Sequence, residues 1–342
     1  MKAENFKPYE YAVFSVVVIA TMVLCVCVGS VDIPLSDTAA IIWNAVFDIP
    51  LPEHITSPSI ILSVRLPRVL CVALAGAALS LCGAAMQGLL KNPLADGSTL
   101  GVSSGAALGA VISIVFGITI PSLPFAGVTI MAIAFAFLSL MLILALAYRL
   151  DYSLSTNTII LVGVVFSMFA TSIVSLIITF APERVQQVTF WTMGTFQGST
   201  YENALMLAAA FAVFGGTLFA HSRELNAFAI GEDNARSVGV NVKRVKLTVM
   251  IAVSALIGVC VSVGGSIGFV GLITPHMLRM IVGPNHKRLL PACAFGGAVF
   301  LLLADLVARV LLRPLELRIG VVTSIVGAIV FIIVFYRSQK KR

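Results

Sequence analysis

The chain has 342 residues, of which 59% are hydrophobic and only 11% are charged, and its formal net charge is +7. Its mean hydropathy is +1.05. Soluble globular domains carry about 25% charged residues, so the composition excludes a soluble domain and indicates a polytopic membrane protein.

Apolar runs follow one another along the whole chain. A run of roughly 20 apolar residues is long enough to cross the hydrocarbon core of a bilayer as a helix. The runs that we identify lie at residues 11–30, 66–90, 99–118, 124–148, 157–180, 203–220, 246–264, 267–283, 291–312 and 318–336. They predict an all-α polytopic membrane protein with about ten transmembrane helices, forming a single domain over 1–342. The first run is too long for the apolar part of a signal peptide, and no A-x-A-like cleavage site follows it.

The basic residues predict the orientation, because Lys and Arg gather on the cytoplasmic side of membrane proteins. With the N-terminus in the cytoplasm and alternating spans, 16 of the 22 basic residues lie inside. The outside then receives Arg65, Arg68, Arg184, Arg309, Arg313 and Arg318. We therefore expect both termini in the cytoplasm. The same asymmetry explains the positive net charge without a nucleic-acid partner.

Motifs for catalysis and metal binding are absent from the sequence. It contains no GxxxxGK[ST] phosphate loop, so the chain is not expected to hydrolyse ATP itself. Its four histidines are scattered and form no HExxH-like cluster, and its six cysteines all lie in apolar runs, where they behave as small hydrophobic residues. We expect no catalytic residues, no metal site and no cofactor bound by this chain.

Asp305 is the only acidic residue well inside a predicted span. It precedes Arg309 by four residues, a spacing that places both side chains on one helix face and favours an ion pair. An intramembrane carboxylate can also relay protons in ion-coupled transporters. A stand-alone proton-driven secondary transporter therefore remains the alternative, and a membrane scaffold is a third possibility.

The stretch Lys91 to Gly109 interrupts the apolar pattern with a polar turn. Pro93 disfavours the helical conformation at the residue before it, and Asp-Gly follows as a second turn signal. Beyond the turn, small residues recur with a spacing of four at Gly101, Gly105 and Gly109. Such a strip lets another helix approach closely in lipid. The polar turn between two packed spans is well placed to line the mouth of a pore.

At this point the sequence resembles a known family. The segments RLPRVL, GAALSLCGAAMQGLLKNPLADGSTLGVSSGAALGA, GEDNARSVGVNVKRVK, GGSIGFVGLITPHMLRMIVGPNHKRLLP, LLLADLVAR and ELRIGVVTSIVGAIVFI resemble the FecCD/cobalamin-type permeases, in the order of that family. These are membrane subunits of type II ABC importers for iron–siderophore complexes, haem or cobalamin. One departure is Arg318, where the family commonly has Pro.

The resemblance implies an importer permease fold and a set of partners. It implies a dimer of identical or homologous permease chains in the bacterial cell (inner or plasma) membrane. Two copies of a separate ABC ATPase subunit would carry ATP and Mg²⁺, and an extracytoplasmic substrate-binding protein would deliver the cargo.

The resemblance also implies roles for particular residues. The arginines expected to dock the binding protein are Arg65, Arg68 and Arg309. The residues expected to couple to the ATPase, in the cytoplasmic loop 221–246, are Gly231, Ala235, Arg236 and Gly239, on a short helix bounded by glycines. The residues expected to form the cytoplasmic gate are Asn92, Leu94, Thr156 and Asn157.

Overall fold

The computed structural model describes residues 5–50, 58–118, 126–152 and 154–339, and helices are the only regular elements in these ranges. The α-helices are α1 (Pro8–Cys27), α2 (Leu35–Phe47), α3 (Leu66–Leu89), α4 (Val102–Phe116), α5 (Ala126–Leu150), α6 (Thr156–Phe180), α7 (Val185–Thr192), α8 (Tyr201–Ala210), α9 (Gly216–Ala220), α10 (Ser222–Ile230), α11 (Glu232–Ser237), α12 (Val242–Gly264), α13 (Val270–Val282), α14 (His286–Val310) and α15 (Ile319–Gln339). Four short π- or 3₁₀-turns adjoin them, namely η1 (Ile60–Arg65), η2 (Gly97–Leu100), η3 (Pro182–Arg184) and η4 (Phe211–Gly215). Lys2, Lys340, Lys341 and Arg342, which contribute to the orientation argument, lie outside the described residues.

The predicted all-α fold is confirmed, and each of the apolar runs forms a helix. Within the described ranges, seven helices are long and apolar enough to cross a bilayer. They comprise Pro8–Cys27, Ile60–Leu89, Gly127–Leu150, Thr156–Phe180, Tyr201–Ala220, Val242–Gly264 and His286–Val310. Three shorter apolar helices, Val102–Phe116, Val270–Val282 and Ile319–Ile333, coincide with the other expected spans. The total of about ten membrane crossings stays a prediction.

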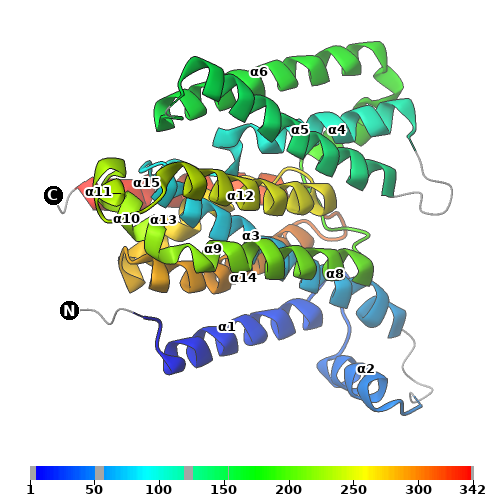
Figure 1. Ribbon diagram of the computed structural model, residues 1–342. Helices are drawn as coiled ribbons and strands as arrows, with labels where there is room; N and C mark the ends of the chain where they lie inside the picture. Colours follow the sequence, from blue (N-terminus) through cyan, green and yellow to red (C-terminus); the bar gives the residue numbers. More distant parts are fainter. Residues whose placement is uncertain (1–4, 51–57, 119–125, 153, 340–342) are drawn as a thin grey trace.

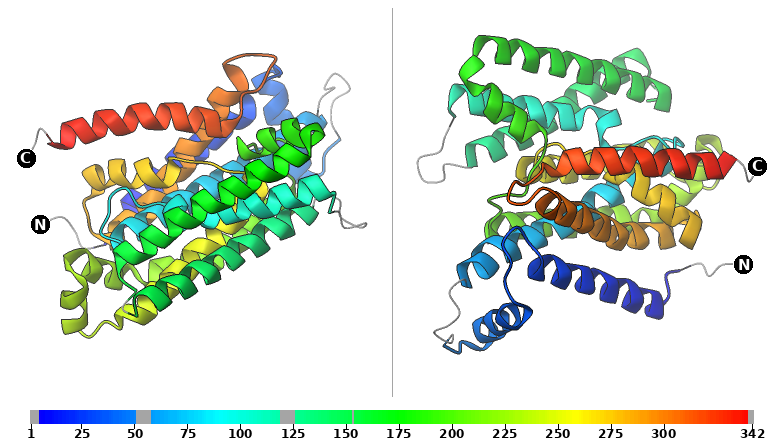
Figure 2. Two further views of the ribbon diagram at one scale, coloured as in Figure 1. Left: turned by 90° about the horizontal axis from the view of Figure 1, so that it is seen from above. Right: turned by 180° about the vertical axis from the view of Figure 1, so that it is seen from behind.

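The helices form three groups across the molecule (Figure 1). Helices α4, α5 and α6 lie together on one side, α1 and α2 lie on the other, and α3, α12 and α14 lie between them. The start of α1, the end of α15 and the short helices α10 and α11 are at the same end, as a second direction of view also shows (Figure 2). We call this the α11 end and the opposite one the distal end.

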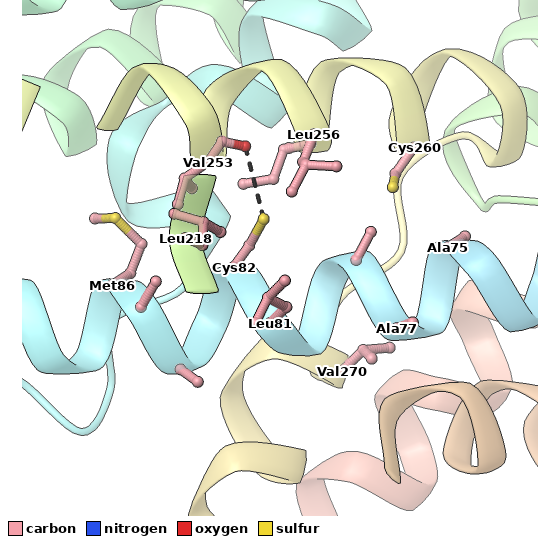
Figure 3. Close-up of a cluster of buried hydrophobic side chains, with 14 of the residues drawn as sticks. Ala75, Ala77, Leu81, Cys82, Met86, Leu218, Val253, Leu256, Cys260 and Val270 are labelled. Carbon is pink, nitrogen blue, oxygen red and sulfur yellow. Dashed lines mark hydrogen bonds between the residues drawn. The ribbon is translucent and has the colours of Figure 1, made fainter. Parts of the chain in front are cut away.

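Helix α3 is the centre of the bundle, because small residues let its neighbours approach its backbone. At the crossing with α14, a Cβ on Gly76 would lie 2.4 Å from the carbonyl oxygen of Gly297. At the crossing with α13, a Cβ on Gly83 would lie 1.8 Å from the carbonyl oxygen of Gly271. Neither crossing has room for a side chain larger than hydrogen. On its third side, α3 packs Cys82 against α12, with Sγ 3.8 Å from the Val253 carbonyl oxygen (Figure 3).

The glycine-rich helix α4 packs closely against α5. A Cβ on Gly105 would lie 2.4 Å from Ser139 Oγ, and one on Gly109 would lie 2.3 Å from the Met131 carbonyl oxygen. Gly101 has a different position from the one expected, since α4 begins only at Val102. Gly101 is the residue before the helix, and its φ of 68° is left-handed, which glycine adopts at little cost.

Candidate functional site

The loop 221–246 at the α11 end contains the short helix that the sequence predicts between two glycines. Gly231, with φ of 146°, and Gly239, with φ of 87°, bound α11 (Glu232–Ser237). Acidic residues in its first turn suit the positive end of the helix dipole. Within α11, Ala235 is fully buried, whereas the side chain of Arg236 is 56% exposed. The helix is therefore fastened on one face and presents a cation on the other.

A buried lysine connects α11 to the turn that precedes α6. Nζ of Lys246, in α12, lies 2.6 Å from Glu232 Oε1 and donates a hydrogen bond of 2.9 Å to the carbonyl oxygen of Leu154. The hydroxyl of Thr156 donates to the same Glu232 oxygen over 3.4 Å. One carboxylate at the start of α11 thus holds both α12 and the first turn of α6.

The Lys246 link is stable because its buried charge is compensated. The Lys246 side chain is only 1% exposed, and an unpaired ammonium at such a site would cost several kcal/mol. A carboxylate and a carbonyl oxygen compensate this charge. Leu154, whose carbonyl accepts the bond, has φ of 52°, an uncommon conformation for a residue other than glycine. The turn is held both by the bond from Lys246 and by its own hydrogen bond from the Leu154 N–H to the Asp151 carbonyl oxygen, at 2.9 Å.

The other predicted gate turn, Asn92-Pro93-Leu94, also lies beside the start of α11. Oδ1 of Asn92 accepts a 2.9 Å hydrogen bond from the backbone N–H of Leu94, which closes the turn. Leu94 is 49% exposed. A Cβ on Gly231 would lie 3.3 Å from Nζ of Lys91, so the side chain of Lys91, the residue before this turn, lies near the start of α11. The side chain of Asn92 thus forms part of the turn.

The two predicted gate turns do not meet each other directly within one chain. Among the described residues, no hydrogen bond or ion pair joins Asn92 or Leu94 to Thr156 or Asn157. The Glu232 carboxylate joins the turn before α6 to α11, whereas the exposed Lys91 side chain beside the other turn only lies near Gly231 at the start of α11. A displacement of α11 would therefore act directly on the turn before α6.

At the distal end, the three arginines expected to dock a binding protein are buried. Arg65, Arg68 and Arg309 are 4%, 6% and 2% exposed. Their guanidinium groups are therefore engaged within this chain, and the docking role expected for these residues stays a prediction. The helix that contains Arg65 and Arg68 starts earlier than expected, with the turn η1 from Ile60, so both residues lie inside a helix and not at its outer start.

Two of these arginines cap the distal end of α1. The last carbonyl groups of a helix have no partner within the helix, and cations there are favoured by the helix dipole. Arg65 donates to the carbonyl oxygens of Val26, at 2.9 Å, and Cys27, at 3.0 Å. Arg309 donates to those of Cys25, at 3.0 Å, and Val28, at 3.2 Å. Both side chains satisfy backbone groups that would otherwise be buried without a partner.

Asp305 has both carboxylate oxygens engaged by arginine. Its Oδ2 lies 3.0 Å from Nε of Arg309, which confirms the predicted i,i+4 pair. Its Oδ1 accepts two hydrogen bonds from Arg68, at 2.9 and 3.1 Å. Arg68 also pairs with Glu316 at 2.8 Å. A carboxylate fixed between two arginines is poorly suited to relay protons.

Helix α6 has a long apolar face that no other described part of the chain covers. Its large exposed side chains include Leu161, Met168 and Phe180. The hydroxyl groups on the same helix donate to carbonyl oxygens one turn earlier, as Thr171 does to Ser167 at 2.8 Å. The surface is therefore apolar and holds few free hydrogen-bonding groups.

The roles of Lys246, Glu232 and Glu316 do not follow from the sequence motifs. The position of Lys246 does carry a signal, since it falls at helical spacing on the buried stripe of Val242, Val245 and Val249. The partner carboxylates of Lys246 and Arg68 come from other elements, and a sequence without tertiary contacts does not identify them.

Comparisons with known proteins agree with this architecture. The model of the FecCD transport family matches residues 17–337. The chain is 37% identical over 321 residues to the ABC transporter permease protein YvrB of Bacillus subtilis, covering 94% of this chain and 91% of that protein. It is 38% identical over 278 residues to the vitamin B12 import system permease protein BtuC of Citrobacter koseri, covering 81% and 83%.

A solved structure is also similar over nearly the whole chain. It is described as a metal-chelate type ABC transporter in an inward-facing conformation. The superposition has a TM-score of 0.84 with 30% sequence identity, and it covers 97% of this chain and all of the other.

Proposed function

Because the chain belongs to the FecCD transport family, we propose that it is the membrane-spanning subunit of an ATP-driven importer for a bulky metal chelate. A separate ATPase subunit, present in two copies, binds ATP and Mg²⁺, and a binding protein delivers the cargo from outside. The observation that carries the coupling mechanism is the buried Lys246, which joins α11 to the turn before α6. The α11 end then faces the cytoplasm, in agreement with the positive-inside rule.

In this proposal α11 docks into the ATPase and transmits its movement. The exposed Arg236 contacts the ATPase, while the buried Ala235 keeps the helix seated on its own chain. Gly231 and Gly239 provide the positive φ angles at the two ends of the helix. Because α11 is short and fixed to α12 by an ion pair, rotation of the ATPase moves it as a rigid body.

The gate consists of the two turns beside α11 and their counterparts in a second permease chain. Leu94 provides an exposed apolar group that excludes water from a closed mouth. Thr156 and Asn157, in the first turn of α6, provide polar groups that tolerate water when the mouth opens. The apolar face of α6 leads from this turn towards the distal end, where it forms one wall of the path. A second chain supplies the opposite wall.

The binding protein docks at the distal end. Bidentate pairing between arginine and carboxylate suits such a contact, but it requires an exposed guanidinium group. Arg184 and Arg313 are exposed there, and Arg313 already holds Asp32 at 2.9 Å. We propose that these two arginines contact the partner. Arg65, Arg68 and Arg309 act indirectly, because they fix α1 and the segment after α14 beneath the docking surface.

The cargo is a metal chelate of the size of cobalamin, haem or a ferric siderophore. The apolar wall of α6, with its hydroxyl groups already hydrogen-bonded, offers few groups that would hold such a cargo tightly. Selectivity then resides mainly in the binding protein. Binding measurements of that protein with each of the three chelates identify the cargo.

The proposed function is tested by uptake into proteoliposomes that contain this chain, its ATPase and its binding protein. Uptake should require ATP on the side of the membrane that holds the ATPase, and it should continue when an uncoupler removes the proton gradient. As a control, replacing ATP with a non-hydrolysable analogue should abolish uptake. Uptake that stops on uncoupling while ATP remains would instead support the proton-driven alternative.

A further inference from the structure

A large cavity lies between α1 and the central helices. Helix α1 is on the side of the molecule away from α6 (Figure 1). The volume of the cavity is about 890 Å³. Residues of α1, α3, α14 and the η4–α9 segment line it, and most of them are apolar. Its larger apolar lining residues are Phe6, Tyr11, Met22, Leu74, Phe211 and Phe295. The proposed cargo path beside α6 does not use this space.

The α11 end of the cavity is cationic. Arg223 of α10 and Lys287 in the first turn of α14 both line it, and no Asp or Glu is among its described lining residues. In the described part of the chain, neither side chain has a hydrogen-bonded or ion-paired partner. The neighbouring Arg288, by contrast, pairs with Glu10. The cavity therefore combines two free cations at one end with an apolar slot behind them.

The depth of the slot matches one leaflet of a bilayer. Along α14 its lining runs from His286 to Ala298, and at about 1.5 Å per residue this is about 18 Å. The hydrocarbon core of a bilayer is about 30 Å thick, so the slot covers about half of it. Helix α1, which closes one side, has little of its surface buried by the rest of the chain. An acyl chain can therefore enter from the membrane.

We propose that this cavity binds one acidic phospholipid of the cytoplasmic leaflet, with its phosphate at Arg223 and Lys287 and an acyl chain between α1 and α14. The side assignment rests on the orientation in the proposed function. Charge complementarity selects an anionic lipid, because basic pockets between transmembrane helices on this side bind acidic head groups. The apolar slot selects a lipid over a free phosphate. The bound lipid fills the space between α1 and the bundle.

Native mass spectrometry of the purified full chain tests this inference. The chain is offered equal amounts of dioleoylphosphatidylglycerol and dioleoylphosphatidylcholine, which differ only in their head groups. It should retain the acidic lipid in preference to the neutral one. Replacing both cations, Arg223→Gln with Lys287→Gln, should reduce that preference roughly 10- to 30-fold, since each basic side chain near an anionic lipid contributes about five-fold.

Two further variants make the result specific. Arg149→Gln with Arg244→Gln removes two exposed cations outside the cavity and should leave the preference unchanged. Ala294→Phe fills the slot without changing its charge and should reduce retention of both lipids. Equal retention of the two lipids by the unmodified chain, or an unchanged preference in the Arg223/Lys287 variant, overturns the inference.

Inorganic phosphate distinguishes a lipid site from an anion site. Millimolar phosphate should not displace the acidic lipid, and displacement would show that the slot contributes nothing. The measurement involves no ATP, ATPase or binding protein. A failure here is therefore separate from a failure of the transport proposal, which the uptake assay detects.

Discussion

Lys246 of α12 and Glu232 of α11 form an ion pair whose atoms lie 2.6 Å apart, and the same lysine holds the carbonyl oxygen of Leu154 at 2.9 Å. The pair connects the helix that we assign to the ATPase contact with the turn that we assign to the gate. The lysine side chain is 1% exposed and the glutamate side chain 28% exposed. This difference in exposure decides what each substitution does.

Lys246→Met should uncouple transport without unfolding the protein. Removing the lysine leaves Glu232 partly hydrated, so no charge remains buried without a partner. Uptake per ATP hydrolysed should fall by at least about five-fold, because coupling free energies between sites are typically about 1–3 kcal/mol. Arg244→Met, at an exposed position of the same helix, is the matched control. Equal coupling ratios for the two variants would show that Lys246 is not a coupling residue.

Glu232→Gln should break the same link but also destabilise the fold. Here the buried ammonium of Lys246 loses its counter-charge, and breaking a buried pair by removing one partner costs about 3–5 kcal/mol. Thermal unfolding in detergent should show a clear drop for this variant and little change for Lys246→Met. The reverse order of stabilities would contradict the burial argument.

Asp305→Asn should destabilise the distal end. It removes the charge that two buried arginines, Arg68 and Arg309, share. The expected loss is about 3–5 kcal/mol in the free energy of unfolding. Glu316→Gln is the control and should cost less, because the glutamate side chain is 21% exposed. A stable Asp305→Asn protein that has lost only proton-dependent uptake would support the relay alternative.

The exposed and buried arginines of the distal end should respond differently to charge reversal. Arg184→Glu with Arg313→Glu should slow association of the binding protein on the order of ten-fold at low salt, with less effect at high salt. Thermal stability should change little, because the Arg313–Asp32 pair is exposed to solvent. Arg65→Glu should lower stability, because the α1 carbonyl groups lose their donor. Surface plasmon resonance and thermal unfolding separate these effects. An association rate that depends neither on salt nor on the substitutions at Arg184 and Arg313 would show that these residues do not contact the binding protein.

Because α4 packs closely on α5, a larger side chain at Gly109 should strongly lower the stability of the protein. Gly109→Leu should reduce folded yield and thermal stability, because a Cβ there already meets the Met131 backbone at 2.3 Å. Ala107→Leu, two residues away at a half-buried position, should be tolerated. Similar stabilities of the two variants would show that α4 does not depend on this approach.

The helices and the short α11 could be predicted from the sequence because each depends on local properties. Apolar length determines the spans, and two glycines determine the ends of α11. Pairings between distant elements could not be predicted in this way. The local sequence around Arg65 and Arg68 is compatible with either exposed or buried side chains. Their burial depends on the turn η1, which starts the helix earlier and so places both residues within it. Lys246 has its partner carboxylate in another helix.

In the proposed mechanism α11 moves the gate through Lys246, and nucleotide-dependent cross-linking between the two permease chains measures this coupling. Asn157→Cys is placed in both permease chains of the assembled importer, and its disulfide yield is measured with and without ATP. Five of the six native cysteines are buried, which limits the background. The yield should change with nucleotide when Lys246 is present and become independent of nucleotide in Lys246→Met. An identical nucleotide response in both proteins, or no cross-link in any state of an importer that still transports, would show that Lys246 does not couple α11 to the gate.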